Sequence, residues 1–125
     1  MCKTLHIVSV PLYQAKAEFF RTLGHPARIR ILELLSEGEL AVHELHAQIE
    51  IEPSNLSQQL AVLRNAGLVT RSRRGGRVLY AIALPEVRDL LLAARRILLA
   101  LIEDRDRLKA DLGSPSAPQT TGLAR

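Results

Sequence analysis

Apolar residues at helical spacing, interrupted by glycine and proline, constrain the fold of this chain more than any other feature. Over residues 11–23 they recur at intervals of three and four, which predicts an amphipathic helix that ends at Gly24. A proline is tolerated in the first turn of a helix, so a second helix is predicted to begin at Pro26 and to end at Gly38. Its aliphatic stripe predicts that this helix is largely buried.

The next segment has the pattern of two short helices joined by a turn. Val42, Leu45 and Ile49 fall on one face of a predicted third helix. The chain leaves the helical conformation just before Pro53, because proline disfavours that conformation in the residue that precedes it. A fourth helix begins there and ends at Gly67, with its leucines directed inward and its Ser, Asn and Gln side chains on other faces.

Two short runs of β-forming residues follow, and Gly75 and Gly76 separate them. A two-glycine turn of this kind predicts a β-hairpin. Two short helices joined by a brief turn, the second polar on its outer face, followed by a basic hairpin, make a winged helix-turn-helix. The predicted fold is therefore mainly α with a small β-hairpin: four helices, two strands and a last helix.

The last predicted helix, residues 85–108, is unusually apolar. Between Val87 and Ile102 twelve of sixteen residues are apolar, and such a helix must be covered on more than one side. The longest uninterrupted apolar run, from Ile97 to Ile102, is far shorter than the roughly 20 residues that cross a membrane. With only two Phe, two Tyr and no Trp in 125 residues, the core must be aliphatic.

These patterns predict three regions: an N-terminal arm (1–10), one winged helix-turn-helix domain (11–110), and a disordered tail (111–125) rich in Gly, Pro, Ser and Thr. No secretory signal is evident at the start, so we expect a cytoplasmic protein without a membrane partner. The single cysteine, Cys2, excludes an intramolecular disulfide.

The positive charge is concentrated in one stretch. Residues 53–85 contain five arginines and no Asp or Glu, whereas the whole chain is only +4. A surface of one sign that follows a polar Ser/Asn/Gln run is typical of a nucleic-acid contact, although a solvated basic hairpin would have the same composition.

Two blocks of sequence resemble a known family. Residues 19–35, FFRTLGHPARIRILELL, and residues 57–69, SQQLAVLRNAGLV, are similar to the opening signature and the recognition helix of the ArsR/SmtB family of bacterial winged-helix repressors. The resemblance implies a homodimer that binds a palindromic operator and that is built on the first and last helices. The residues expected at the dimer interface are Leu12, Phe19, Leu90, Leu91, Ala94, Leu98 and Leu101.

We expect the fourth helix to enter the major groove, where amides offer a donor and an acceptor side by side, as an adenine edge requires. Hairpin arginines then hold the backbone or a narrow minor groove. An alternative is that Ser54 or Ser57 only caps the helix. The candidate DNA-binding residues are Ser54, Asn55, Ser57, Gln58, Gln59, Arg64, Arg71, Arg73, Arg74 and Arg77.

Many members of the family that this chain resembles sense metals, and this sequence departs from both of the ligand sets that such members use. Ala41 and His43 stand where some members have a cysteine pair, and the last helix has no histidine. What remains is Cys2, His6, His43 and His46, which would suit zinc, cobalt or nickel if the N-terminal arm folded onto the third helix. We expect no metal and no cofactor, and a metal-responsive repressor is the alternative.

Two other classes of function were considered. The glycine pair lies in a predicted hairpin rather than between a strand and a helix, so it is no phosphate loop, and no nucleophile with a base is evident. We therefore expect no enzyme. A winged-helix adaptor that binds proteins has no reason to exclude acidic residues from both the fourth helix and the hairpin, which favours DNA.

Overall fold

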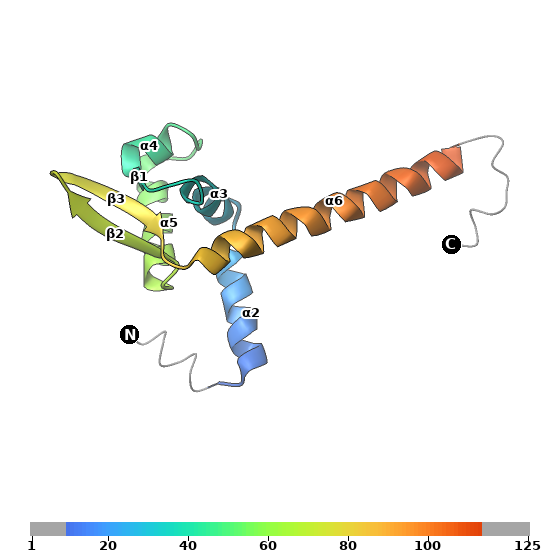
Figure 1. Ribbon diagram of the computed structural model, residues 1–125, viewed down its shortest axis with the longest axis horizontal. Coiled ribbons are helices and arrows are strands. Elements are labelled where there is room, and N and C mark those ends of the chain that lie inside the picture. The colour runs from blue at the N-terminus through green and yellow to red at the C-terminus, as the bar shows by residue number, and fades with distance from the viewer. Residues whose placement is uncertain (1–9, 114–125) are drawn as a thin grey trace. The chain divides into compact units, whose positions relative to one another are not determined.

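The computed structural model describes residues 10–113, so most of the predicted arm and tail, with Cys2 and His6, lie outside the described residues (Figure 1). The chain divides into two compact units, and the boundary falls between Arg88 and Asp89, inside the last helix.

Four helices and a small sheet build the first unit, up to Arg88, and the last helix, α6, begins in it. The elements are α2 (Leu12–Leu23), α3 (Pro26–Leu35), β1 (Leu40–Ala41), α4 (Val42–His46), α5 (Pro53–Asn65), β2 (Val69–Arg74), β3 (Arg77–Ile82) and α6 (Pro85–Gly113). The predicted order of helices and strands is confirmed. Three bounds differ: α3 ends before Gly38, α4 ends before Ile49, and α6 continues past residue 108.

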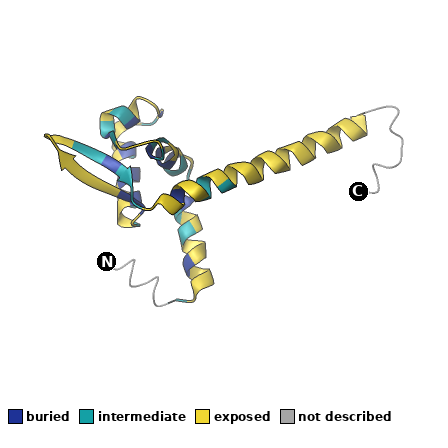
Figure 2. Cartoon of the chain, viewed as in Figure 1, coloured by how far each residue is buried: buried dark blue, intermediate teal, exposed yellow. Residues whose placement is uncertain are grey.

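The core of the first unit is aliphatic, as the composition predicts. Its largest fully buried side chains come from the three helices around the helix-turn-helix: Ile31, Leu32, Leu45, Leu56, Leu60 and Leu63. In Figure 2 the buried positions, in dark blue, gather in the first unit, whereas most of α6 is coloured as exposed. Each fully buried leucine or isoleucine contributes about 1.5–3 kcal/mol relative to its exposed state, so this cluster holds α5 in place.

A third strand, β1, was not predicted. Leu40 and Ala41 pair antiparallel with Tyr80 and Leu79, so the sheet has the order β1-β3-β2. Two residues are too few for an alternating pattern to be visible in a sequence. The strand joins the edge of the hairpin directly to the start of α4.

The turn between β2 and β3 has the predicted geometry. Gly75 and Gly76 have φ of 57° and 79°, and positive φ at both central residues is what a tight two-residue hairpin requires. Arg74 pairs with Arg77 across this turn, and the ladder runs from there to Val69 and Ile82.

A glycine also ends α5. Gly67 has φ of 82°, and the amide of Leu68 donates to the carbonyl of Leu63 at 3.0 Å, which is the bond of a Schellman motif. Leu63 and Leu68 are both buried, so the motif turns the chain from α5 into β2 over an apolar contact.

The second unit begins at Asp89 and, among the described residues, consists of the rest of α6. Large apolar side chains along it are exposed: Leu92, Ile97, Leu98, Leu99, Leu101, Ile102, Leu108 and Leu112. Across residues 10–113, the structure contains no helix that is both long and apolar enough to cross a membrane.

Candidate nucleic-acid interface

The first turns of α5 present short polar side chains to solvent. Pro53 occupies the first turn, and Ser54, Ser57 and Gln58 are exposed. The N-cap residue is Glu52, and no side chain caps the helix, while both serines lie inside it. The alternative that Ser54 or Ser57 caps α5 is therefore wrong, and both hydroxyls are free to meet a ligand.

Asn55 and Gln59 lie one turn apart and differ from this exposed set. Asn55 is half-buried, and Gln59 is only 8% exposed. Gln59 accepts a hydrogen bond from Arg28 of α3 and donates one to Asn55. The structure thus gives Gln59 no outward polar group, and we leave it out of the proposed DNA-contacting residues.

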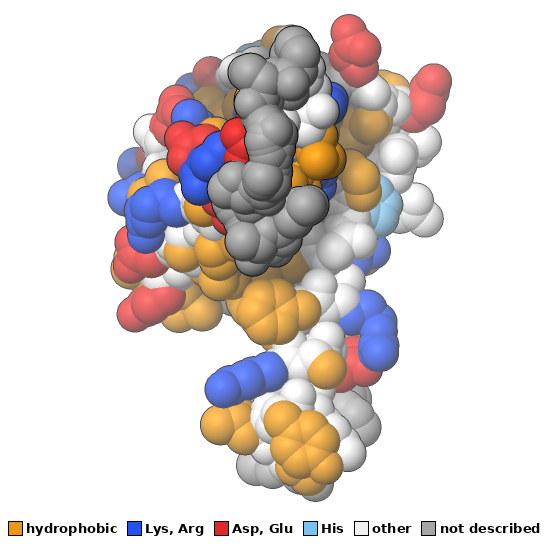
Figure 3. Space-filling model, turned by 90° about the vertical axis from the view of Figure 1, so that its right-hand side faces the viewer, with side chains coloured by type: hydrophobic (Ala, Val, Ile, Leu, Met, Phe, Trp, Pro, Cys, Tyr) orange, Lys and Arg blue, Asp and Glu red, His pale blue; other side chains and the backbone are white. Residues whose placement is uncertain are grey.

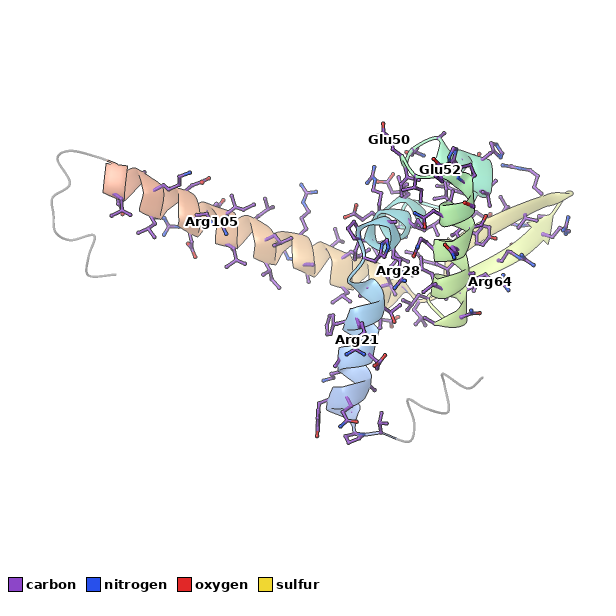
Figure 4. All side chains as sticks on the ribbon, turned by 180° about the vertical axis from the view of Figure 1, so that it is seen from behind. Arg21, Arg28, Glu50, Glu52, Arg64 and Arg105 are labelled. Carbon is purple, nitrogen blue, oxygen red and sulfur yellow. The ribbon has the colours of Figure 1, made fainter. Side chains whose placement is uncertain are left out.

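Arg64 lies in the last turn of α5 and is exposed, at the end of the helix where β2 begins (Figure 4). A cation at this position also interacts favourably with the negative end of the helix dipole. Arg64 lies at the opposite end of α5 from Ser54, so its side chain extends the polar surface of the helix toward the hairpin.

The hairpin, called the wing below and comprising residues 69–82, carries four exposed arginines on two faces. Directly opposed residues of an antiparallel pair share a face, so Arg71, opposite Tyr80, and Arg73, opposite Val78, lie on the face that includes the buried Tyr80. Arg74 and Arg77 oppose each other and belong to the other face.

Two glutamates from outside the wing form ion pairs with Arg74 and Arg77. Arg74 forms an ion pair with Glu39, and the Nη2 atom of Arg77 lies 3.3 Å from Oε1 of Glu44. Within residues 10–113, no ion pair involves Arg71 or Arg73. The stretch of residues 53–85 contains no acid, but the fold brings two carboxylates to it from the segment that contains β1 and α4.

Glu44 has a double role. Its carboxylate accepts a hydrogen bond from the amide of Ala41 at 2.8 Å, at the start of α4, and it faces Arg77. The hydrogen bond from Ala41 is the main cause that holds the pKa of Glu44 below its ordinary range. Desolvation opposes it, and the charges of Arg77 and His43 lower the pKa further. Sequence reasoning missed this residue, although a glutamate three residues into a helix is a common capping signal.

The residues expected at the dimer interface are mostly exposed. On α2, Leu12 is 70% exposed and Phe19 is half-buried, with Phe20 packed edge-on against it at 5.4 Å between ring centres. Hydrophobic side chains lie at the surface of α2, in the lower part of Figure 3. On α6, Leu90 and Leu91 are half-buried, and Ala94, Leu98 and Leu101 are exposed.

Of the three histidines that the structure describes, one has a structural role and two line a cavity. His25 caps α3, since its Nδ1 atom accepts from the amide of Ala27 at 3.1 Å. His43 and His46 line a shallow, mainly apolar cavity of about 490 Å³ beside Pro53 and Arg77. No cluster of three or more metal-ligating side chains occurs between residues 10 and 113. The predicted partners Cys2 and His6 lie outside that range.

Comparison with known proteins identifies the family. Residues 25–71 match the family model described as "Bacterial regulatory protein, arsR family". The uncharacterized HTH-type transcriptional regulator Rv0081 of Mycobacterium tuberculosis is 52% identical over 105 residues, which cover 83% of this chain and 92% of that protein. Its crystal structure matches with a TM-score of 0.71 and 54% identity over 78% of this chain and 98% of that chain.

Two further solved structures are similar at lower identity. The transcriptional repressor BigR from Xylella fastidiosa matches with a TM-score of 0.64 and 36% identity, over 68% of this chain and 87% of that chain. The homodimeric winged helix-turn-helix DNA-binding domain of Mb0332 from Mycobacterium bovis matches with a TM-score of 0.66 and 29% identity, over 74% and 86%. This chain belongs to the ArsR family of bacterial regulatory proteins, which are transcriptional regulators and not enzymes.

Proposed function

We propose that this regulator is a repressor that binds an inverted-repeat operator as a homodimer and blocks access of polymerase to the promoter. The observation that carries the proposal is the set of exposed polar side chains on α5 and exposed arginines on the wing, two elements whose own residues include no acid. Such a surface attracts phosphates and presents base-reading side chains next to them. BigR, a similar protein, is a repressor, which supports the assignment of repression.

In this proposal α5 lies in the major groove. Ser54 and Ser57 bond to phosphates or base edges, and Gln58, with Asn55, reads base edges. Arg64 and the wing arginines contact the backbone, and the register of the wing favours Arg71 and Arg73, whose face has no ion pair among the described residues. The placement follows the docking geometry of helix-turn-helix proteins.

Dimerisation in this proposal uses α2 and α6. Contiguous apolar side chains on a surface mark a protein contact, and both helices carry them in exposed positions. The homodimeric state of the Mb0332 domain supports a second copy of this chain as the partner. A two-fold dimer places its recognition helices in successive major grooves, about 34–36 Å apart, so the half-sites are about one helical turn apart. The protein then acts in the cytoplasm, where its operator is.

The test is a footprint of the full chain on the promoter region of its own gene, with a salt titration of the binding constant. The expected result is a protected inverted repeat, with a slope of about −0.9 per phosphate contact. The same footprint with and without zinc, cobalt or nickel examines the alternative of a metal-responsive repressor. Binding that is independent of salt, or no protection of any DNA, would contradict the proposal and favour a protein-binding adaptor.

A further inference from the structure

A chain of hydrogen bonds connects α2, α3 and α5. In α3, Arg28 donates from Nη1 to the carbonyl of Thr22 in α2 at 3.0 Å, and from Nε to Oε1 of Gln59 in α5 at 2.8 Å. Gln59 then donates from Nε2 to Oδ1 of Asn55 at 2.9 Å. Figure 4 shows Arg28 where α3 approaches α5. The chain therefore ends on a side chain of the proposed DNA-contacting surface.

The orientation of both amides in this chain is set by chemistry. A guanidinium group has donors only, so the atom of Gln59 that faces Arg28 must be its oxygen. The nitrogen of Gln59 then faces Asn55, and the atom of Asn55 that receives it must also be an oxygen. If either amide were reversed, two N–H donors would face each other beside the buried Gln59. Leaving these buried donors without an acceptor costs about 1–3 kcal/mol.

We propose that Arg28, acting through Gln59, sets the hydrogen-bonding polarity of Asn55, so that Asn55 meets DNA as a donor. The inference rests on the proposed function and refines it. Oδ1 is engaged by Gln59, so the amide NH2 group is the polar group of Asn55 left with both of its hydrogens to donate. Its partner on DNA is therefore an acceptor: a purine N7, a guanine O6 or a phosphate oxygen.

This polarity disfavours one mode of reading that the residue type alone allows. An asparagine with both amide atoms free reads adenine by accepting from N6 and donating to N7. In Asn55 the oxygen already accepts from Gln59, so a bond from N6 would have to share that oxygen and would use its second lone pair. Arg28 and Gln59 are thus positioning residues. They touch no base, but they determine which groups on DNA can bind Asn55.

The sharpest test is a substitution that reverses the polarity. In Gln59→Glu, the introduced carboxylate still accepts from Arg28, but it has no hydrogen to give to Asn55. The amide of Asn55 must then turn its NH2 group toward this carboxylate and its oxygen outward. Gln48→Glu adds the same charge at an exposed residue before α5 and is the matched control.

The readout is operator DNA modified one atom at a time, at the position where Asn55→Ala changes the binding constant. For the parent and for Gln48→Glu, we expect a loss of about tenfold when the facing purine loses N7 (7-deazapurine) or, if the partner is the backbone, when that phosphate becomes a methylphosphonate. Either result identifies Asn55 as a donor. A loss with 7-deazapurine assigns the base as its partner, and a loss with methylphosphonate assigns the phosphate. Removal of an exocyclic amino group at the same position should have a clearly smaller effect, because the oxygen of Asn55 is already engaged by Gln59.

For Gln59→Glu, we expect this sensitivity to be lost and a new sensitivity to removal of the exocyclic amino group to appear. A thermal unfolding curve checks that the variant folds. If it does not, Asn55→Asp gives the loss of N7 or phosphate sensitivity by itself, because aspartate accepts from Gln59 and has no donor to present. A parent complex that depends on an exocyclic amino group opposite Asn55 would overturn this inference alone, whereas a parent that protects no DNA would overturn the proposed function as well.

Discussion

Arg77 of β3 and Glu44 of α4 form an ion pair, with 3.3 Å between Nη2 and Oε1. The same oxygen accepts the amide hydrogen of Ala41, so one carboxylate both starts α4 and holds the wing. The first helix of the helix-turn-helix and the wing are therefore linked by an electrostatic contact as well as by the pairing of β1 with β3.

This pair makes the stability of the protein depend on pH in a defined direction. The pKa of Glu44 is lowered in the folded state, so its contribution is fully present above the ordinary glutamate pKa of about 4.3 and is lost as the pH falls through the lower folded value. We expect the thermal midpoint of the parent to fall more steeply on acidification below about pH 4.3 than that of Glu44→Gln, which has no charge to lose. Parallel curves for the two proteins would contradict this role of Glu44.

Replacement of Gln58 by alanine should relax sequence preference and leave the fold intact. Gln58 is exposed on α5, so its loss removes no buried contact. Loss of one base-reading amide should cost about 1–3 kcal/mol of discrimination at one or two base pairs. Selection of operator variants by the purified protein measures the effect, with Gln48→Ala as the control. An unchanged preference in both proteins would exclude Gln58 from the base-contacting residues.

Arg74→Ala should weaken binding to all DNA sequences alike, although by less than Arg71→Ala, because Glu39 competes with phosphate for Arg74. A lost phosphate contact lowers the slope of log K against log salt by about one unit. Glu39→Gln should do the opposite, because it releases Arg74 from its ion pair. Exposed pairs are weak, so we expect a gain of about two- to fivefold at low salt. Salt titrations of a mobility-shift assay measure both, and equal slopes for Arg74→Ala and the parent would contradict the contact.

Leu98→Glu and Leu101→Glu should each shift the protein from dimer to monomer. Both side chains are exposed on α6, at 58% and 53%, and a charge there opposes burial against a second copy. Arg105→Gln changes the net charge by the same one unit on the same helix, where the side chain is polar and exposed, and it should stay dimeric (Figure 4). Sedimentation equilibrium measures the state. A dimer that survives both leucine variants would place the interface elsewhere.

Much of this fold could be predicted, because its signals are local. The bounds of α2 and α5 follow from apolar periodicity and from the residues that end helices, and the turn follows from two adjacent glycines. β1 could not be predicted, since two residues carry no period. Its identity as a strand depends on β3, about forty residues further along the chain.

The candidate site was harder to predict, because several of its contacts are between distant residues. Gln59 was grouped with Gln58 by residue type, yet it lies three residues after the buried Leu56 and so on the same side of the helix. That spacing was the signal in the sequence that Gln59 faces the core. Its partner Arg28 is 31 residues away, and the pairing of Glu39 with Arg74 spans 35 residues, so no local pattern could indicate either.

The row of solvent-facing leucines on α6 has a thermodynamic consequence. If a twin chain covers them, association and folding share one equilibrium, and mass action makes the melting temperature rise with the amount of protein present. Such a regulator is least stable at low concentration, so the number of copies in a cell would determine how long each copy stays folded.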